Sequence, residues 1–220
     1  EGILSSRLDG FEFRPQQVDM ASAVEEAFGK AKHLIVEAGT GTGKSLAYLI
    51  PAILWAVENN KKVVISTYTK TLQHQILNHD IPFLRDKLGI AFRYALCMGN
   101  ENYLSLRRLK RSAQAGLFTK SDEENQRDGI FNWAEETETG FRSDLPFEVL
   151  PQVWEEVGRQ KDLCLGKSCE THSSCFYFKA RKKWFGAHLL IVNHHLFFAN
   201  VANAGAVLPA FDAVVFDEAQ

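Results

Sequence analysis

A glycine-rich stretch near the start of the chain has the residue types of a phosphate-binding loop. It runs from Glu37 to Ser45 and follows the Walker A pattern, except that Ala38 replaces the usual first glycine. Because glycines have no Cβ, the backbone N–H groups of such a loop can turn inward around a phosphate chain. Lys44 would then reach the β- and γ-phosphates, and the Ser45 hydroxyl would coordinate a magnesium ion. We predict that the site consists of Ala38, Gly39, Thr40, Gly41, Thr42, Gly43, Lys44 and Ser45.

Two adjacent carboxylates near the end of the chain could complete this chemistry. The apolar run 213–216 is followed directly by Asp217 and Glu218, which is the form of a Walker B strand. Asp217 would hold the magnesium ion through water, and Glu218 would orient or deprotonate the attacking water. We therefore expect Lys44, Asp217 and Glu218 to be catalytic. The alternative is a strand that runs into an ordinary loop, and the Walker A loop upstream makes it the weaker interpretation.

Two glutamines upstream of the loop could recognise a base. The run Phe13, Arg14, Pro15, Gln16 and Gln17 opens a segment whose apolar residues recur at helical spacing. One amide supplies both a donor and an acceptor, so Gln17 or Gln16 could read the edge of adenine. We include Phe13 and Arg14 in this predicted contact. The alternative is an ordinary capped surface helix.

Alternating strands and helices must position these residues. Residues 33–36 are a short apolar run before the loop, which predicts a buried parallel strand, and residues 45–57 are apolar nearly all round, which predicts a buried helix. Pro51 should kink that helix or mark its boundary. Further strands are predicted at 63–67, 92–96, 188–192 and 213–216. The order of these elements predicts an α/β fold with a central parallel sheet.

A hydroxyl-rich segment follows the second predicted strand. Thr67, Thr69 and Gln73 lie where that strand ends and a helix begins. Helix N-termini favour anions, so these side chains are candidates for contacts with a phosphodiester backbone. A polar loop with a helix cap would explain Thr71 but not the density of hydroxyls.

Three of the four cysteines lie close together. Cys164, Cys169 and Cys175 occupy one short segment, and Cys97 lies far upstream. In a cytosolic protein such clustering favours a metal over a disulfide, and the intervals are longer than those of most zinc sites. Thiolates spread over a loop in this way suit an iron–sulfur cluster. Unligated thiols, and zinc bound by the three cysteines and His172, remain alternatives.

The residues after Cys175 interleave aromatic side chains with cations. This pattern suits base stacking together with phosphate contacts, so Lys179, Arg181 and Lys182 are candidate contacts to nucleic acid. An amphipathic helix with a solvated basic face explains the pattern equally well.

Composition limits the partners. The formal net charge of −2 gives no overall attraction to nucleic acid, so any such contact must come from local patches. No apolar run approaches the roughly 20 residues that span a bilayer, and the start has no signal peptide, so we expect a cytoplasmic protein without a membrane partner. Because the sequence begins with Glu1 and stops within a motif, we expect it to be a piece of a longer chain.

Taken together and in order, these motifs resemble the XPD/DinG family of superfamily 2 DNA helicases. The residues that carry the resemblance are 13–17, 37–45, 66–69, Leu72, Gln73, Gln75, 102–104, 192–196 and 217–220. The resemblance implies a RecA-like P-loop motor domain formed by residues 1–97 and 186–220. It also implies an inserted, mainly helical iron–sulfur domain at 98–185.

The resemblance further implies an ATP hydrolase that uses ATP and Mg²⁺ and moves 5′→3′ on single-stranded DNA, with single-stranded or forked DNA as its partner. The insertion would hold a [4Fe-4S] cluster through Cys164, Cys169 and Cys175 with Cys97 as a candidate fourth ligand, and it would help to part the duplex. We expect a monomer.

Two positions depart from the family pattern. Ser105 occupies the position of the first cluster ligand, so either Cys97 substitutes or the cluster is three-iron, labile or absent. Gln220 stands where the family commonly has a histidine that couples hydrolysis to DNA binding.

The leading hypothesis is therefore the N-terminal motor part of an ATP-dependent DNA helicase. Because the second RecA-like domain with its arginine finger lies outside these 220 residues, we expect the isolated chain to bind ATP weakly and to show little turnover. The alternatives are a nucleotide-switched nucleic-acid-binding module without unwinding activity and an RNA-directed ATPase.

Overall fold

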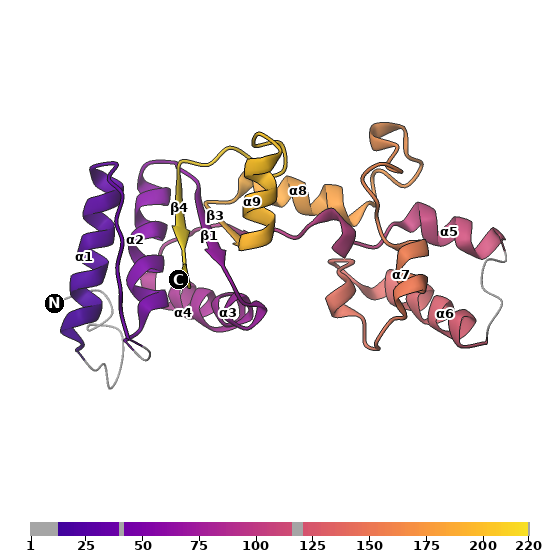
Figure 1. Cartoon of the computed structure of the whole chain (residues 1–220), viewed down its shortest axis with the longest axis horizontal. Helices are drawn as coiled ribbons and strands as arrows, with labels where there is room; N and C mark the ends of the chain where they lie inside the picture. The colour runs from indigo at the N-terminus through magenta and orange to yellow at the C-terminus, as the bar shows by residue number, and fades with distance from the viewer. Residues whose placement is uncertain (1–12, 40–41, 116–120, 220) are drawn as a thin grey trace. The chain divides into compact units, whose positions relative to one another are not determined.

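The computed structural model describes residues 13–39, 42–115 and 121–219, and it divides the chain into two compact units (Figure 1). The first unit comprises Glu1–Cys97 and Trp184–Gln220, and the second comprises Met98–Lys183. The second unit is thus an insertion between two parts of the first.

A parallel sheet forms the centre of the first unit. Its strands are β1 (Val63–Thr67), β2 (Tyr94–Leu96), β3 (Leu189–Asn193) and β4 (Ala213–Phe216), in the spatial order β2-β3-β1-β4. In register, Val63 lies opposite Leu189 on one side and Ala213 on the other. β1 and β3 are almost wholly buried because they lie at the centre of the sheet and helices cover it. The prediction of an α/β fold with a parallel sheet is confirmed.

Helices flank this sheet (Figure 1). α1 (Pro15–Gly29) packs on α2 (Lys44–Glu58), and the ring of Phe28 stacks on Trp55 at 5.1 Å. α3 (Lys70–Gln75), the π-helical turn η1 (Ile76–Asp80) and α4 (Ile81–Leu88) follow one another without a break, and α9 (His194–Ala202) follows β3.

Of the two predictions for Pro51, a helix boundary does not occur, because α2 continues through this residue. A proline inside a helix costs about 3 kcal/mol. Pro51 is buried, and its neighbours Leu49, Ala52 and Ile53 belong to the main hydrophobic core. Tertiary packing therefore outweighs the local preference.

Residues 33–36 do not form the buried strand that their apolar run predicts. The structure assigns no strand there, and Ile35 is 98% exposed. An extended segment becomes a strand only where a neighbouring strand supplies hydrogen-bond partners. β4 is the outermost strand next to β1, and within residues 13–39, 42–115 and 121–219 its other edge pairs with no strand. The prediction of a strand at residues 33–36 was wrong. An apolar run shows that a segment can be buried, but it does not show that a neighbouring strand will form backbone hydrogen bonds with it.

The second unit is mainly helical. It contains α5 (Leu106–Ala115), α6 (Ser121–Glu136), α7 (Pro151–Val157) and most of α8 (Phe176–Gly186), with short 3-10 turns at Asn100–Asn102, Arg142–Asp144 and Gly166–Ser168. Tyr103 is fully buried at its centre, with its ring 4.8 Å from that of Phe141 and 5.2 Å from that of Tyr177. The Arg159 guanidinium lies 4.0 Å from the Tyr177 ring centroid. The unit therefore has an aromatic core of its own.

None of the described helices is long and apolar enough to cross a membrane.

Candidate active site

The glycine-rich loop leads into the first turn of α2. Gly43 precedes the helix with φ 76°, a left-handed conformation that favours glycine. A Cβ at this position would overlap the side-chain amide of Gln17. Lys44 and Ser45 are thereby placed at a helix N-terminus, where backbone N–H groups and the helix dipole attract phosphate. Thr40 and Gly41, which belong to the predicted site, lie outside the described residues.

The side chains of this loop bond to the loop itself. Lys44 Nζ donates to the carbonyl oxygen of Ala38 at 3.1 Å, and Thr42 Oγ1 donates to that of Gly39 at 2.9 Å. A phosphate oxygen would be a charged acceptor for Lys44 in place of a neutral carbonyl, which makes a stronger hydrogen bond.

Of the two glutamines proposed to read adenine, Gln17 reaches the loop. Its Nε2 donates to the Gly43 carbonyl oxygen at 3.0 Å, and the side chain is half-buried. Gln16, Arg14 and Phe13 are exposed, Phe13 by 65%. The structure therefore joins α1 to the loop through Gln17 and leaves the other three residues at the surface.

Asp217 is held by a residue that the motifs do not include. The Tyr48 hydroxyl donates to Asp217 Oδ2 at 2.8 Å, and Tyr48 is only 2% exposed. Asp217 Oδ1 accepts from the Glu218 backbone N–H at 2.9 Å, and the Asp217 N–H donates to the Ser66 carbonyl at 2.9 Å. This network links the second turn of α2 to the end of β4. The sequence offered one signal for Tyr48, since a residue three positions after Ser45 lies on the same helix face.

Glu218 has an unusual backbone. Its φ is 58°, in the left-handed region that residues other than glycine rarely adopt. Such conformations cluster at active sites, where the surrounding structure maintains them. The Thr69 hydroxyl faces this residue, with Oγ1 at 3.4 Å from Glu218 Oε2.

A second carboxylate lies near Ser45. Asp80, the last residue of η1, is half-buried, and its Oδ2 is buried without a hydrogen-bond partner in the structure. Burial raises the pKa of Asp80, and hydrogen bonding from the Ser45 hydroxyl and the Gln75 amide partly opposes that rise. Burial also raises the pKa of Tyr48 well above its usual value, and the Asp217 charge acts in the same direction. No motif pointed to Asp80.

The residues proposed to contact nucleic acid after β1 differ in exposure. Thr69 caps α3, where its Oγ1 accepts from the Leu72 N–H at 3.2 Å. Thr67 is fully buried and its hydroxyl lies 3.4 Å from the Val192 carbonyl oxygen, and Gln73 is 4% exposed. Neither of these two side chains is presented at the surface, because both point into the core beneath α3. Tyr68, which the sequence did not single out, is 64% exposed.

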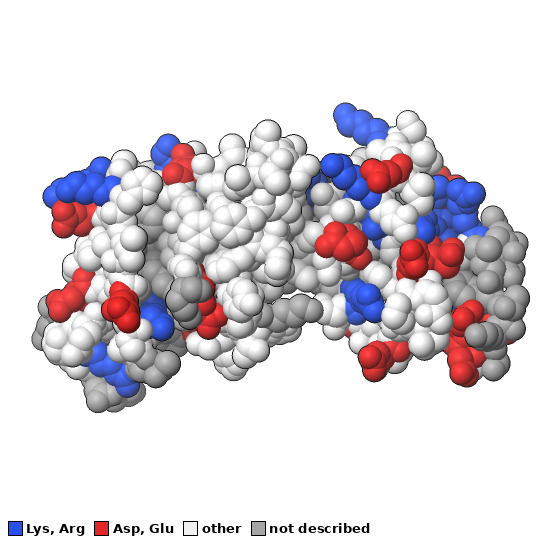
Figure 2. Space-filling model, viewed as in Figure 1, with Lys and Arg blue, Asp and Glu red and all other residues white. Residues whose placement is uncertain are grey.

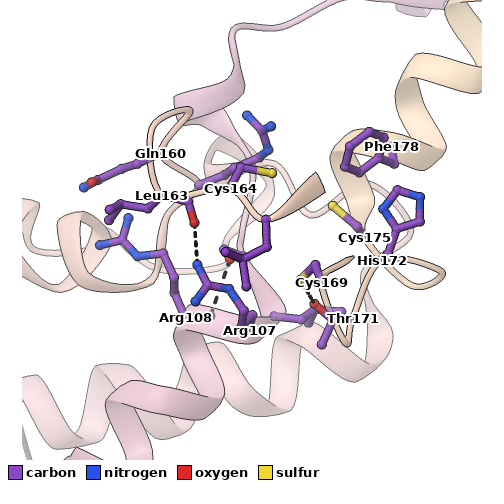
Figure 3. A pocket seen from close by; sticks show the side chains of 14 residues that line it. Arg107, Arg108, Gln160, Leu163, Cys164, Cys169, Thr171, His172, Cys175 and Phe178 are labelled. Atoms are coloured by element: carbon purple, nitrogen blue, oxygen red, sulfur yellow. Dashed lines mark hydrogen bonds between the residues drawn. The ribbon is translucent and has the colours of Figure 1, made fainter. Parts of the chain in front are cut away.

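The three clustered cysteines line one pocket in the second unit, as Figure 3 shows. Ser105 and His172 line the same pocket, and His172 Nδ1 is buried without a hydrogen-bond partner in the structure. Cys97 is not among the lining residues. It follows β2 and is only 1% exposed, and the lining of the pocket gives no support to its role as the replacement ligand.

The pocket is not arranged as a metal site. In the described part of the chain, no group of three or more His, Cys, Asp or Glu side chains is placed to hold a metal ion. Cys169 Sγ lies 3.4 Å from the Thr171 hydroxyl, and Cys164 Sγ accepts from the Gly166 N–H at 3.4 Å. The cavity of about 30 Å³ has room for roughly two water molecules. Thiolates are suitable donors for a cluster, but in this arrangement the residues do not fit a [4Fe-4S] group.

Arginine side chains hold the walls of this pocket together. Arg107 Nη2 donates to the Leu163 carbonyl at 2.6 Å, a bond drawn in Figure 3. Arg108 donates to the carbonyls of Gly158 and Glu155 at 2.8 and 2.7 Å. Arg107 and Arg108 are thus engaged in structural bonds, whereas Lys110 and Arg111 of the same helix are exposed.

The aromatic residues of α8 differ in exposure. Phe176, Tyr177 and Trp184 are buried, so these three rings are not free to stack on bases, whereas Phe185 is 62% exposed. Of the cations, Lys179 and Lys182 are exposed, and Arg181 donates to the Tyr177 hydroxyl at 3.3 Å. On the face drawn in Figure 2, charges of both signs are interspersed over the second unit rather than forming a basic stripe. The nucleic-acid contacts of Lys179, Arg181 and Lys182 therefore stay a prediction, beside the alternative of an amphipathic helix with a solvated basic face.

Comparison with known proteins shows similarity to helicases. A family model described as DEAD/DEAH box helicase matches residues 15–122. The chain is 37% identical over 229 residues to the ATP-dependent DNA helicase YoaA of Haemophilus influenzae, covering 99% of this chain and 34% of that protein. It is 37% identical over 238 residues to the ATP-dependent helicase DinG of Mycobacterium tuberculosis, covering 99% and 35%. The 3′-5′ exonuclease DinG of Bacillus subtilis is 31% identical over 229 residues, covering 100% and 23%. The chain thus spans about a third or less of these relatives.

Proposed function

Because the chain belongs to the DinG-like family of superfamily 2 helicases, we propose that it is the N-terminal motor part of an ATP-dependent DNA helicase. The observation that supports this most is the bond from Tyr48 to Asp217. It connects the helix that begins at Lys44 with the strand end that carries the carboxylates, although these segments are far apart in the sequence. A phosphate-binding helix N-terminus and a carboxylate pair at one edge of a parallel sheet are what ATP hydrolysis requires.

Each residue has a defined role in this proposal. Lys44 moves from the Ala38 carbonyl to the β- and γ-phosphates of bound ATP. Ser45 and Asp217 would hold the magnesium ion. The ion would neutralise charge on the phosphate oxygens. Glu218 orients and deprotonates the attacking water, while Thr69 holds the Glu218 carboxylate. Gln17 positions the loop and is the candidate for the adenine contact.

The test is Glu218→Gln in the full-length protein. The substitution keeps the size of the side chain and removes the base, so ATP turnover should fall by about 100-fold or more while ATP and DNA binding persist. Glu58→Gln, an exposed substitution at the end of α2, is the matched control. Unwinding that continues at the unaltered rate would overturn the enzymatic proposal, and would leave a nucleotide-switched binding module as the better account.

Further parts of the proposal concern DNA. We infer translocation 5′→3′ on single-stranded DNA, with single strands or forks as the preferred partner. Duplexes with a 5′ or a 3′ single-stranded tail distinguish the direction, because only the 5′-tailed duplex should be unwound. An RNA strand offered in competition tests the RNA-directed alternative, since contacts limited to the phosphate backbone carry little information about the sugar.

The nucleotide site of such motors is completed by a second RecA-like domain. An arginine finger contributes on the order of 10³ to 10⁵ in rate. We therefore expect the 220 residues alone to bind ATP weakly and to turn it over slowly. Strong DNA-stimulated ATPase activity from this chain alone would contradict that expectation.

The [4Fe-4S] cluster stays a prediction, and no step above depends on it. Analysis of iron and acid-labile sulfide in protein purified without oxygen tests it directly. Zinc in place of iron would favour a site formed by the three cysteines and His172.

A further inference from the structure

Two side chains outside the recognised motifs face the part of the site that should hold magnesium. Tyr48 belongs to α2 and Asp80 to η1, and these elements pack together in one hydrophobic core that includes Leu49, Ile76 and Ile81. Both residues are therefore fixed by packing rather than placed on a loop.

Tyr48 determines how Asp217 presents its oxygens. Oδ2 accepts from the Tyr48 hydroxyl at 2.8 Å and Oδ1 accepts from the Glu218 N–H at 2.9 Å. A carboxylate has about four lone-pair positions, so both oxygens keep capacity for water that surrounds a metal ion. Because Tyr48 is almost fully buried, its hydroxyl has little freedom to choose another partner.

Asp80 carries an unsatisfied acceptor. Its Oδ2 is buried without a hydrogen-bond partner in the structure, and such groups in native proteins call for an explanation such as a water molecule or an ion. Asp80 also ends a π-helical turn inserted between α3 and α4, and π-turns of this kind occur frequently at functional sites.

We propose, on the basis of the function above, that Tyr48 and Asp80 are positioning residues for the magnesium site. Tyr48 orients Asp217, and Asp80 Oδ2 accepts a hydrogen bond from water around the ion held at Ser45 and Asp217. Magnesium keeps several of its waters when it binds to proteins, so carboxylates that contact only those waters can still determine its affinity.

With these roles for Tyr48 and Asp80, the continuous helical segment α3–η1–α4 reaches the candidate active site at two points. Thr69 at its N-terminus faces Glu218, and Asp80 lies eleven residues further along the same segment. A displacement of α3 by a bound strand would therefore reach both the water-activating residue and the magnesium site.

The test measures the Mg²⁺ dependence of nucleotide binding rather than turnover. A fluorescent ATP analogue is titrated into the full-length protein at a series of Mg²⁺ concentrations, for the unaltered protein and for Tyr48→Phe and Asp80→Asn. Each variant should need about tenfold more Mg²⁺ for half-maximal binding, as expected for a partner of a metal ligand. Binding in excess EDTA should stay within twofold of the unaltered protein, because neither residue contacts the nucleotide.

Matched controls separate this role from a structural one. Tyr94→Phe removes a hydroxyl from β2, and Asp86→Asn removes an exposed carboxylate from α4, so both should leave the Mg²⁺ dependence unchanged. If Asp80→Asn does not fold, Asp80→Glu retains the charge and should restore most of the unaltered Mg²⁺ dependence.

The outcomes distinguish a failure of the positioning roles of Tyr48 and Asp80 from a failure of the proposed motor function. An unaltered Mg²⁺ dependence in both variants would overturn this inference and leave the motor proposal intact. Absence of any Mg²⁺-dependent nucleotide binding in the unaltered full-length protein would overturn both.

Discussion

The nucleotide site and the cysteine pocket both collect residues from separated parts of the sequence, but only in the nucleotide site do the functional side chains contact one another. Tyr48 bonds to Asp217, Gln17 bonds to the loop and Thr69 faces Glu218. In the pocket, the thiols of Cys164 and Cys169 bond to local groups, and no metal-holding group forms within the described residues.

The difference follows from the elements that carry each site. The nucleotide site lies at a helix N-terminus and at strand ends, whose positions backbone hydrogen bonds fix. The cysteines lie mostly in loops between short helices, and sites on regular elements are positioned more accurately than sites on loops. Three bonds from Arg107 and Arg108 to backbone carbonyls, and one from Arg159 to the Asn100 side chain, hold the second unit together, and none of these bonds is made to a thiol.

The largest expected effect tests the nucleotide site. Lys44→Ala in the full-length protein should reduce ATP turnover by about 100-fold or more, because removal of one preorganised charge that stabilises a transition state costs about 3 kcal/mol. Lys30→Ala is the control, since Lys30 forms only an exposed pair with Glu26. A change of less than threefold in steady-state ATPase would show that the loop does not hold the reacting phosphates.

The next prediction tests the pocket. Ser105→Cys should leave the iron content well below about four per chain, because a fourth thiol does not by itself rearrange the three that already line the cavity without forming a metal-holding group. Iron and sulfide are measured after purification without oxygen. Cys97→Ser should also leave the iron content unchanged, since Cys97 is buried and does not line the pocket. Loss of iron on Cys97→Ser would identify Cys97 as a cluster ligand.

Gly140→Ala should destabilise the second unit without changing nucleotide binding. Gly140 has φ 65°, and a Cβ there would overlap the Phe176 ring, so the expected loss is about 2–4 kcal/mol from strain and overpacking. Gly166→Ala separates these causes, because Gly166 also has a positive φ but has open space around it. Chemical denaturation of the two variants measures the difference. Equal losses would show that overlap with Phe176 contributes nothing.

The smallest effect concerns the start of β4. Asp212 accepts from Lys61 Nζ at 2.8 Å and from the Lys62 N–H at 2.9 Å, and these bonds lower its pKa. A lowered folded-state pKa gives stability that is present above the unfolded value of about 3.9 and is lost as the pH falls through the folded value. Asp212→Asn should therefore cost about 0.2–1 kcal/mol at pH 7 and almost nothing at pH 2, because this exposed pair is screened by solvent. A loss that does not change with pH would point to a backbone effect instead.

Much of the first unit could be predicted from the sequence. The apolar runs predicted the strands that became β1, β2, β3 and β4 because a parallel sheet covered on both faces needs near-continuous apolar strands. The loop and the Asp217–Glu218 pair were recognisable because their chemistry requires particular residue types at fixed spacing. Local chemistry of this kind is encoded in neighbouring residues.

Features that depend on distant partners were decided only by the tertiary structure. Residues 33–36 have the composition of a strand but pair with none in the described chain, and Pro51 stays within α2 because the core holds it there. Phe176, Tyr177 and Trp184 of α8 became core, although their spacing among cations also suits a stacking surface. Tyr48 and Asp80 belong to no motif, and they lie near the proposed magnesium ligands because α2 and η1 pack together. The sequence by itself therefore identifies the motif residues, because their types and spacing are local. Only the tertiary structure shows which distant side chains lie beside them, because that depends on how the helices and strands pack.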